Sequence, residues 1–380
     1  MNRHITYQAA NIVAETVAKH FAFHLAAARE RGEQDLAPEP SAEAVKAIID
    51  TAFWASLQRE EGYPPKISIA FLPPECTDTP LLFEKRLPLK PSTLTKLAPG
   101  VERPGIHLGV WQEQGELYLW GATRSVPSLC YVLDVPEPGL LVVKHRRLDG
   151  FGKFANVVVL KGDQIKLVDE QSASLPDCPD LLTSLLGFSS PVAWGESVNV
   201  LVQLAVSMRA HKRGGTLLVV PHGTDAWRES FSKPISYAVA PAYSSLSKLM
   251  EQEASLRDDG AWQEAVRRAV DAIAGFTAVD GAAVISDQYE LLAFGAKIVR
   301  PSGKDQVEEM VVTEPVVGGG AVRVQPALHG GTRHLSAAQF VHDQQDALAL
   351  VASQDGRFTI FAWSPCEGMV HAHRIDALLL

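Results

Sequence analysis

The sequence has little cysteine, and its cysteines are far apart. The four of them, Cys76, Cys130, Cys178 and Cys366, form no closely spaced pair. Zinc-binding motifs and disulfide frameworks both depend on such recurring short spacings. The sequence therefore predicts reduced thiols and indicates neither a zinc site nor a disulfide framework.

The sequence also has fewer basic than acidic residues. It contains 35 lysines and arginines and 44 aspartates and glutamates, which gives a formal net charge of −9. Nucleic acids and anionic lipids select a basic face. No run of about 18 uncharged apolar residues is present either. The amino-terminal apolar pattern includes Glu15 and Lys19, unlike a signal peptide. We therefore expect a soluble cytoplasmic protein that binds neither nucleic acid nor a membrane.

What the sequence does contain is enough apolar material for more than one core. It has 380 residues, of which 46% are hydrophobic. Single hydrophobic cores seldom grow beyond roughly 250–300 residues. We predict two domains, at residues 1–185 and 186–380.

The first half combines two helices with consecutive β-hairpins. Residues 5–31 and 43–60 place apolar side chains at intervals of three and four, as amphipathic helices do. From about residue 66, β-branched and aromatic runs flank glycine-containing turns, as in "IHLGVWQEQGELYLWGA". The pattern predicts an α+β, hairpin-rich amino-terminal domain.

The second half alternates helical and strand patterns. Helices are predicted at 194–211, 240–257 and 261–275, and a buried strand at 214–220. "AAVISDQYELLAFGA" is typical of a hairpin, and "ALALVAS" and "FTIFAW" are typical of strands. The fold class expected here is α/β, with a mixed central sheet flanked by helices.

The segment "GGTRHLSAA" has the composition of an anion site. Its two glycines allow a close backbone approach, and Thr332, Arg333 and His334 supply hydrogen-bond donors. A helix starting near Ser336 would add the positive field of its free N–H groups. The alternative is an exposed loop whose arginine and histidine face water.

Two further polar stretches adjoin predicted strands. Asp280 precedes the strand of "AVDGAAVIS", and Ser353, Gln354 and Asp355 follow the strand of "ALALVAS". Each stretch read alone fits an ordinary turn. Together with a phosphate site, the carboxylates of Asp280 and Asp355 would suit Mg²⁺ or Mn²⁺ bound with a nucleotide.

In this order, "DGAAVIS", "GGTRH" and "DALALVASQDG" resemble motifs of the diadenylate cyclase family, over about residues 190–380. The catalytic DAC domain of that family makes cyclic di-AMP from two ATP. The resemblance implies that Asp280, Arg333 and His334 are catalytic and that Asp280 and Asp355 bind the metal. It assigns nucleotide binding to Gly281, Ala282, Gly331, Thr332, Arg333, His334 and Ser353.

The resemblance also implies a reaction between two copies of the chain. Two ATP-loaded domains of a homo-oligomer face each other, and each 3′-hydroxyl attacks the α-phosphorus of the other ATP. The hairpin-rich first half is similar to the probable sensor domains, of the DACNV type, that precede such cyclases. That similarity implies an unidentified small-molecule ligand for the first domain.

Three departures from the family pattern keep other functions open. Leu335 stands where the family has a second arginine, Gln354 and Asp355 stand in place of two glutamates, and the segment between Asp280 and Gly331 is longer. An inactive nucleotide-binding or cyclic-dinucleotide-sensing regulator is one alternative. A phosphohydrolase that uses Arg333 and His334 as histidine phosphatases do is another, although those enzymes have glycine where Leu335 lies.

Overall fold

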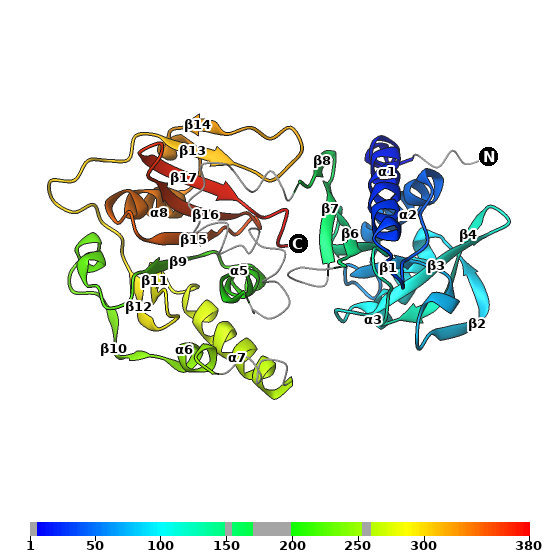
Figure 1. Ribbon diagram of the computed structural model, residues 1–380, viewed down its shortest axis with the longest axis horizontal. Coiled ribbons are helices and arrows are strands. Elements are labelled where there is room, and N and C mark those ends of the chain that lie inside the picture. Colours follow the sequence, from blue (N-terminus) through cyan, green and yellow to red (C-terminus); the bar gives the residue numbers. More distant parts are fainter. Residues whose placement is uncertain (1–5, 149–153, 170–198, 253–259) are drawn as a thin grey trace. The chain divides into compact units, whose positions relative to one another are not determined.

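The computed structural model describes residues 6–148, 154–169, 199–252 and 260–380 (Figure 1). The chain divides into two compact units, Met1–Val168 with Leu380, and Asp169–Leu379. Each unit has one mixed sheet, so the expected fold class is confirmed. The predicted domain boundary between residues 185 and 186 lies outside the described residues.

The first unit is built on an eight-stranded sheet in the order β2-β4-β3-β1-β5-β6-β7-β8. The predicted hairpins are confirmed as the antiparallel pairs β3–β4, β5–β6 and β7–β8. β1 joins them by pairing parallel to β3 and antiparallel to β5. The strands are β1 Ile67–Phe71, β2 Leu81–Pro88, β3 His107–Glu113, β4 Glu116–Thr123, β5 Tyr131–Glu137, β6 Leu140–Arg146, β7 Phe154–Lys161 and β8 Gln164–Leu167.

Helices cover one face of this sheet, as Figure 1 shows. Alternate residues of β1, such as Ile69 and Phe71, point to that face and join the apolar side of the helices in one buried core. The Ser41 hydroxyl caps the second helix by accepting the Ala44 N–H at 3.1 Å. The helices are α1 Gln8–Glu30, α2 Ala42–Ser56 and α3 Pro91–Val101, and the first two confirm the predicted helices.

A polar row crosses the other face of the sheet. The Ser68 hydroxyl donates to Asp134 Oδ1 at 2.5 Å, so its oxygen accepts the Nδ1–H of His107 at 2.6 Å. Asp134 also forms an ion pair with Lys144. Burial lowers the pKa of His107 to about 4, against the opposing effect of Asp134. His107 is therefore a neutral donor at pH 7.

The buried His107 should make the first unit acid-sensitive. Its folded-state pKa of about 4 lies below the usual 6.5, so the unfolded chain binds the proton first as the pH falls. Stability is full above about pH 6.5 and declines toward pH 4, with a loss of about 2 kcal/mol by pH 5 from this group. Chemical unfolding at pH 7 and pH 5 measures the loss.

A His107→Asn variant should reduce the difference between the two pH values by about that amount. His20, whose pKa burial lowers to about 3, still contributes in the same direction. The comparison uses the pH difference rather than the absolute stability, because the variant also changes the bond to Ser68 at every pH. An unaltered pH difference in the variant would contradict the prediction.

The second unit is built on a nine-stranded sheet in the order β10-β12-β11-β9-β15-β16-β17-β13-β14. The predicted strand at 214–220 is confirmed as β9, the predicted hairpin as β11–β12, and the two later strands as β15 and β16. The strands are β9 Gly215–Val220, β10 Tyr237–Tyr243, β11 Ala282–Ser286, β12 Leu291–Ala296, β13 Met310–Thr313, β14 Val322–Val324, β15 Leu348–Ala352, β16 Phe358–Ser364 and β17 Met369–Arg374.

Helices pack on both faces of the second sheet (Figure 1). Along β15, Leu348 and Leu350 belong to the core beneath α5, α6 and α7, whereas Ala349 and Val351 belong to the core beneath α8. Burial on both faces explains the uninterrupted apolar sequence of this strand. The helices are α5 Val200–Ala210, α6 Ser245–Met250, α7 Gly260–Phe276 and α8 Thr332–Asp343.

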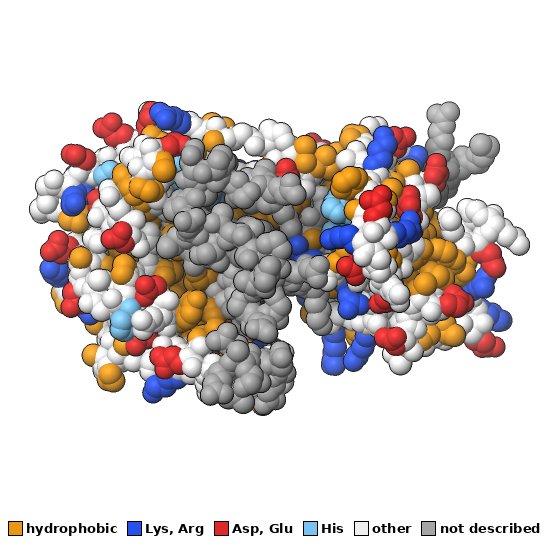
Figure 2. All heavy atoms as spheres, in the orientation of Figure 1, with side chains coloured by type: hydrophobic (Ala, Val, Ile, Leu, Met, Phe, Trp, Pro, Cys, Tyr) orange, Lys and Arg blue, Asp and Glu red, His pale blue; other side chains and the backbone are white. Residues whose placement is uncertain are grey.

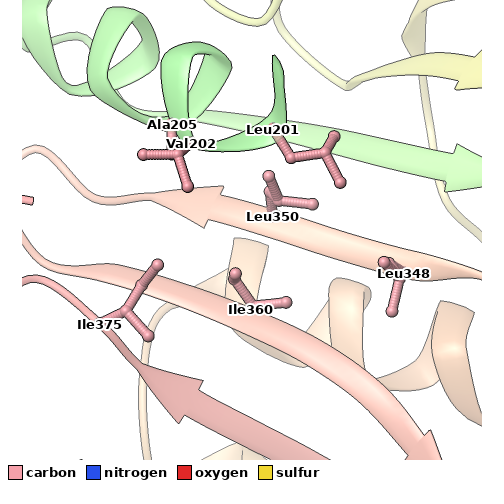
Figure 3. A pocket seen from close by; sticks show the side chains of 7 residues that line it. All are labelled: Leu201, Val202, Ala205, Leu348, Leu350, Ile360 and Ile375. Carbon is pink, nitrogen blue, oxygen red and sulfur yellow. The ribbon is translucent and has the colours of Figure 1, made fainter. Parts of the chain in front are cut away.

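The contact between α5 and the sheet encloses an apolar cavity of about 10 Å³. Figure 3 shows side chains of α5 on one side and those of β15 and β16 on the other. A space of this size is at the lower limit for a single water molecule. The cavity is therefore a packing defect in the core and not a ligand site. Its lining consists of Leu201, Val202, Ala205, Leu348, Leu350, Ile360 and Ile375.

Two predicted helices differ from the structure. In the described part of the helix predicted at 240–257, α6 accounts for Ser245–Met250, and residues 253–257 lie outside the described residues. Its predicted start is wrong, because β10 occupies Tyr237–Tyr243 and includes Pro241, which an edge strand accommodates and a helix interior does not. The helix predicted at 194–211 begins at Val200, where the Asn199 side chain accepts the Val202 N–H. Residues 194–198 lie outside the described residues. The helix predicted at 261–275 is confirmed as α7.

Candidate functional site

The sheet register brings two of the three sequence motifs, those of Asp280 and Ser353, to one end of the second sheet. β9 and β11 run parallel, with Ala282 beside Thr216. β15 runs antiparallel to β9, with Ala352 beside Gly215. The start of β11 and the end of β15 therefore lie at the same end of the sheet. We call it the motif end, marked by Gly214, Asp280 and Ser353.

Arg333 lies against the motif end. A Cβ added at Gly214 would be 3.0 Å from Arg333 Nη1 and 3.2 Å from the Ala352 carbonyl oxygen, and Gly214 has a φ of +70°. Only glycine leaves room for the guanidinium at this position without backbone strain. Arg333 is exposed, so its donors remain accessible to a ligand.

The helix that carries Arg333 begins earlier than predicted. α8 starts at Thr332 with Gly331 as its N-cap, and not near Ser336. Ser336 lies inside the helix and is half-buried, because its neighbours along the chain pack into the core. The early start puts Thr332, Arg333 and His334 in the first turn. The N–H groups at the start of the helix and the guanidinium therefore belong to the same turn.

His334 is half-buried between α8 and the sheet. Its Nε2 lies 3.3 Å from Thr359 Oγ1, and its ring meets that of Phe361 edge-on, with 5.8 Å between ring centroids. Burial lowers the pKa of His334, and Arg357 lowers it further, although Asp355 acts in the opposite direction. His334 is therefore a neutral hydrogen-bonding group at neutral pH. Arg333 supplies the permanent positive charge.

Leu335 belongs to the apolar packing of α8 and not to the polar groups of the motif end. Its side chain is partly buried and packs against the core between α8 and the sheet. The position at which the family resemblance expects a second arginine is therefore used for packing.

The two predicted metal ligands are exposed carboxylates, each with a cationic neighbour. Asp280 is 91% exposed, and its Oδ2 lies 4.0 Å from Lys297 Nζ. Asp355 Oδ2 lies 3.3 Å from Arg357 Nε. Exposed pairs of this kind contribute little to stability. Each carboxylate is therefore available to exchange its partner for a ligand cation.

The turn after β15 fixes the position of Asp355. The Ser353 N–H donates to the Arg357 carbonyl oxygen at 2.9 Å, and the Gly356 N–H donates to the Ser353 carbonyl oxygen at 3.2 Å. Gln354 is exposed, and its amide donates to the Arg213 carbonyl oxygen at 3.4 Å. Gln354 thereby ties this turn to the residues preceding β9.

Glycine is required where β11 and β12 meet. Gly281 has a φ of +107°, and a Cβ there would be 2.6 Å from the carbonyl carbon of Gly295. Gly295 has a φ of +59°, and a Cβ there would be 2.7 Å from the Tyr237 ring. Ala282, the first residue of β11, is buried beneath this contact. The turn that carries Asp280 is thus held by close backbone packing.

The donor chemistry of the motif end suits a hard divalent cation shared with a ligand. Among the described residues, no group of three or more His, Cys, Asp or Glu side chains is arranged to hold a metal by itself. Mg²⁺ is typically held by one or two carboxylates together with phosphate oxygens. Asp280 and Asp355 fit that pattern, and Mg²⁺ or Mn²⁺ stays a prediction.

Several residues at the motif end were not found by sequence reasoning. Lys297 and Arg357 lie beside strand ends with no motif of their own, and their pairing with Asp280 and Asp355 depends on the sheet register. Gly214 had a usable signal, since a glycine pair begins the strand predicted at 214–220.

The opposite end of the same sheet has a hollow of about 350 Å³ between the end of β9 and the loop after α8. Lys304 and Asp346 are among its charged lining residues, with Trp227 at its side. None of the predicted site residues lines it. The hollow is therefore separate from the motif end and carries charges of both signs.

Figure 2 shows basic and acidic side chains interspersed over the described face of each unit. Among the described residues, the helices are all too short or too polar to cross a membrane.

Comparison with known proteins identifies part of the first unit. Residues 34–124 match the family model described as "Probable sensor domain DACNV". This range runs from just before α2 to the end of β4. The predicted sensor domain in the first half is thus supported. No curated protein matches the chain.

Among solved structures, the chain is similar to a hypothetical membrane-spanning protein from Bacillus cereus. The two are 16% identical with a TM-score of 0.27, and the similarity covers 50% of this chain and 68% of that one. A similarity this low carries no conclusion about fold or function.

Proposed function

We propose that the second unit is a diadenylate cyclase-like nucleotidyltransferase that converts two ATP to cyclic di-AMP and pyrophosphate, controlled by the sensor domain of the first unit. The observation that carries the proposal is the convergence of Asp280, Arg333 and Ser353 on one end of the sheet. They come from three separate segments of the chain. The DACNV match supports the regulatory half of the proposal.

The triphosphate would bind at the start of α8. The helix N-terminus offers the N–H groups of Thr332 and Arg333, which precede the first N–H bonded to Gly331, and Arg333 adds a guanidinium that suits bidentate phosphate contacts. Gly331 has no atom within 4 Å of a would-be Cβ, so the backbone there is open to a ligand. Thr332 adds a hydroxyl, and neutral His334 adds a hydrogen bond without charge.

The proposed chemistry is an in-line transfer between two bound nucleotides. Each ribose 3′-hydroxyl oxygen bonds to the α-phosphorus of the other ATP, and the bond from that phosphorus to the bridging oxygen of pyrophosphate breaks. Asp280 accepts a hydrogen bond from the hydroxyl and draws its proton away as the new P–O bond forms. A divalent cation, when bound, would stabilise negative charge on the phosphate oxygens.

Such a reaction requires two copies of the chain with their motif ends facing each other. Alignment of two bound reactants can lower the activation free energy by on the order of 7–11 kcal/mol. The exposed position of Asp280 and Arg333 is compatible with a partner nucleotide approaching from outside the sheet. The active species we propose is accordingly a homo-oligomer.

A regulator that binds nucleotides without turnover is the second candidate. It is favoured by Leu335, a partly buried packing residue in place of one expected cation, and by the pairing of Asp355 with Arg357. A single assay separates the candidates: the purified chain is incubated with ATP and Mg²⁺ or Mn²⁺, and the products are identified by mass. Cyclic di-AMP with pyrophosphate supports the cyclase. Tight ATP binding without product supports the regulator, and release of inorganic phosphate from simple esters supports a phosphohydrolase.

Removal of the Arg333 guanidinium should weaken phosphate binding in either candidate. A charge-assisted hydrogen bond is worth about 1.5–3 kcal/mol, so Arg333→Ala should lower the affinity for inorganic triphosphate by about 10- to 150-fold. Arg333→Lys should recover part of the loss, since it keeps the charge and loses the bidentate geometry. Isothermal titration calorimetry measures both.

The matched control is Arg323→Ala. Arg323 is an exposed arginine of β14, the edge strand farthest from β9 on that side of the sheet. Its replacement should leave triphosphate affinity unchanged. Equal affinities in Arg333→Ala and Arg323→Ala would refute the assignment of the phosphate site.

A further inference from the structure

Three aromatic rings form a column at one side of the motif end. Phe276 of α7 packs against Phe294 of β12 with 4.6 Å between ring centroids. Tyr237 of β10 lies almost parallel to Phe294, with centroids 4.9 Å apart and an interplanar angle of 9°. Tyr237 is 51% exposed. Phe294 covers one face of the Tyr237 ring, and the column ends there in an accessible aromatic surface.

Close backbone packing holds this ring beside the Asp280 turn. The would-be Cβ of Gly295 lies 2.7 Å from Tyr237 Cδ2 and 3.5 Å from the Asp280 carbonyl oxygen. Gly281 in turn packs against Gly295. The two glycines therefore allow the exposed ring and the proposed ribose-binding residue to lie next to each other.

We propose that Tyr237 is the stacking platform for the nucleotide base, an inference that rests on the proposed function. An aromatic ring already stacked on one face presents a fixed, flat surface at the other, and a purine extends the column at little cost in side-chain entropy. Every base has such a face, so stacking supplies affinity for a nucleotide over bare phosphate and does not select the base. Selection of adenine is left to hydrogen-bonding groups.

The inference is tested by binding rather than by turnover. The probes are inorganic triphosphate and an ATP analogue with a methylene group between the α- and β-phosphorus, from which pyrophosphate cannot leave. Titrations use the full chain with Mg²⁺ present. Loss of a base stack costs about 5- to 150-fold in affinity, so Tyr237→Ala should weaken the analogue by that factor. Triphosphate affinity should stay within about twofold, because it offers no base to stack.

Matched variants separate stacking from general damage to β10. Tyr243 is 42% exposed on the same strand and pairs near the other end of β12, so Tyr243→Ala should bind both probes as the parent does. Tyr237→Phe keeps the ring and should keep the affinity, whereas Tyr237→Leu keeps apolar area and should lose it.

Each outcome distinguishes this inference from the proposed function. If Tyr237→Ala binds the analogue as tightly as the parent does, the platform is wrong while the phosphate site stands. The same conclusion follows if the parent binds the analogue no tighter than triphosphate. If the parent binds neither probe, the proposed function fails and the platform fails with it.

Discussion

An Asp280→Asn variant is expected to fold as the parent does and to make cyclic di-AMP at least about 100-fold more slowly, the scale of loss typical for a group that acts on developing charge. Asparagine keeps the shape of the side chain but loses the negative charge, so it neither withdraws the hydroxyl proton nor ligates the metal effectively. Because Asp280 is 91% exposed, the substitution removes no core contact. Product formation by mass spectrometry and thermal unfolding together measure the effect.

Asp346→Asn is the control for this prediction. Asp346 is an exposed aspartate next to the other end of β15, at the hollow opposite the motif end. It should retain parental activity. Cyclic di-AMP formation at the parental rate by Asp280→Asn would show that the site has been wrongly assigned, whatever the control does.

The second large effect is expected from Gly281→Ala, and it concerns stability. The added methyl group would lie 2.6 Å from the Gly295 backbone, and alanine would be held at a φ of +107°. Strain and overpacking together should cost about 2–5 kcal/mol. For a unit of this size, the melting temperature should fall by on the order of 10 °C. Differential scanning calorimetry measures the shift.

Gly331→Ala provides the comparison within the same site. Gly331 has a φ of −81°, and nothing lies within 4 Å of its would-be Cβ. The substitution should cost no more than about 1 kcal/mol through the weaker helix cap. If the two variants melt at the same temperature, the backbone contact between Gly281 and Gly295 is not a constraint on the fold.

Local sequence patterns were sufficient to predict an element where a turn or the burial of an apolar run decides its structure. The hairpins of the first unit follow from turn glycines between β-branched runs, and β9 and β15 follow from apolar runs buried on both faces. Where local preferences conflict with the sheet, sequence reasoning failed. The segment around Pro241 fits a helical period, yet it pairs with β12 as an edge strand.

In the candidate site, too, the local patterns could be predicted from the sequence and the contacts between segments could not. The order of the motifs around Asp280, Arg333 and Asp355 is readable in the sequence, and so is the preference of these residue types for phosphate and metal. The convergence of Asp280 and Asp355 is set by the parallel pairing of β11 and β9 and the antiparallel pairing of β15 with β9, and Arg333 joins them through its contact with Gly214. No local pattern specifies these contacts. The partly buried position of Leu335 likewise depends on the rotation of α8 against the sheet.

The long segment between Asp280 and Gly331 has a consequence for any shortened form of the protein. It supplies β13, which pairs parallel to β17, and β14, a three-residue edge strand, whereas β17 has six residues. Deletion of residues 299–329 would turn β17 into an edge strand with unpaired N–H and C=O groups. Such an edge is a template for self-association. A chain shortened in this way should therefore aggregate, because the exposed edge of β17 can pair with the same edge in another copy of the chain.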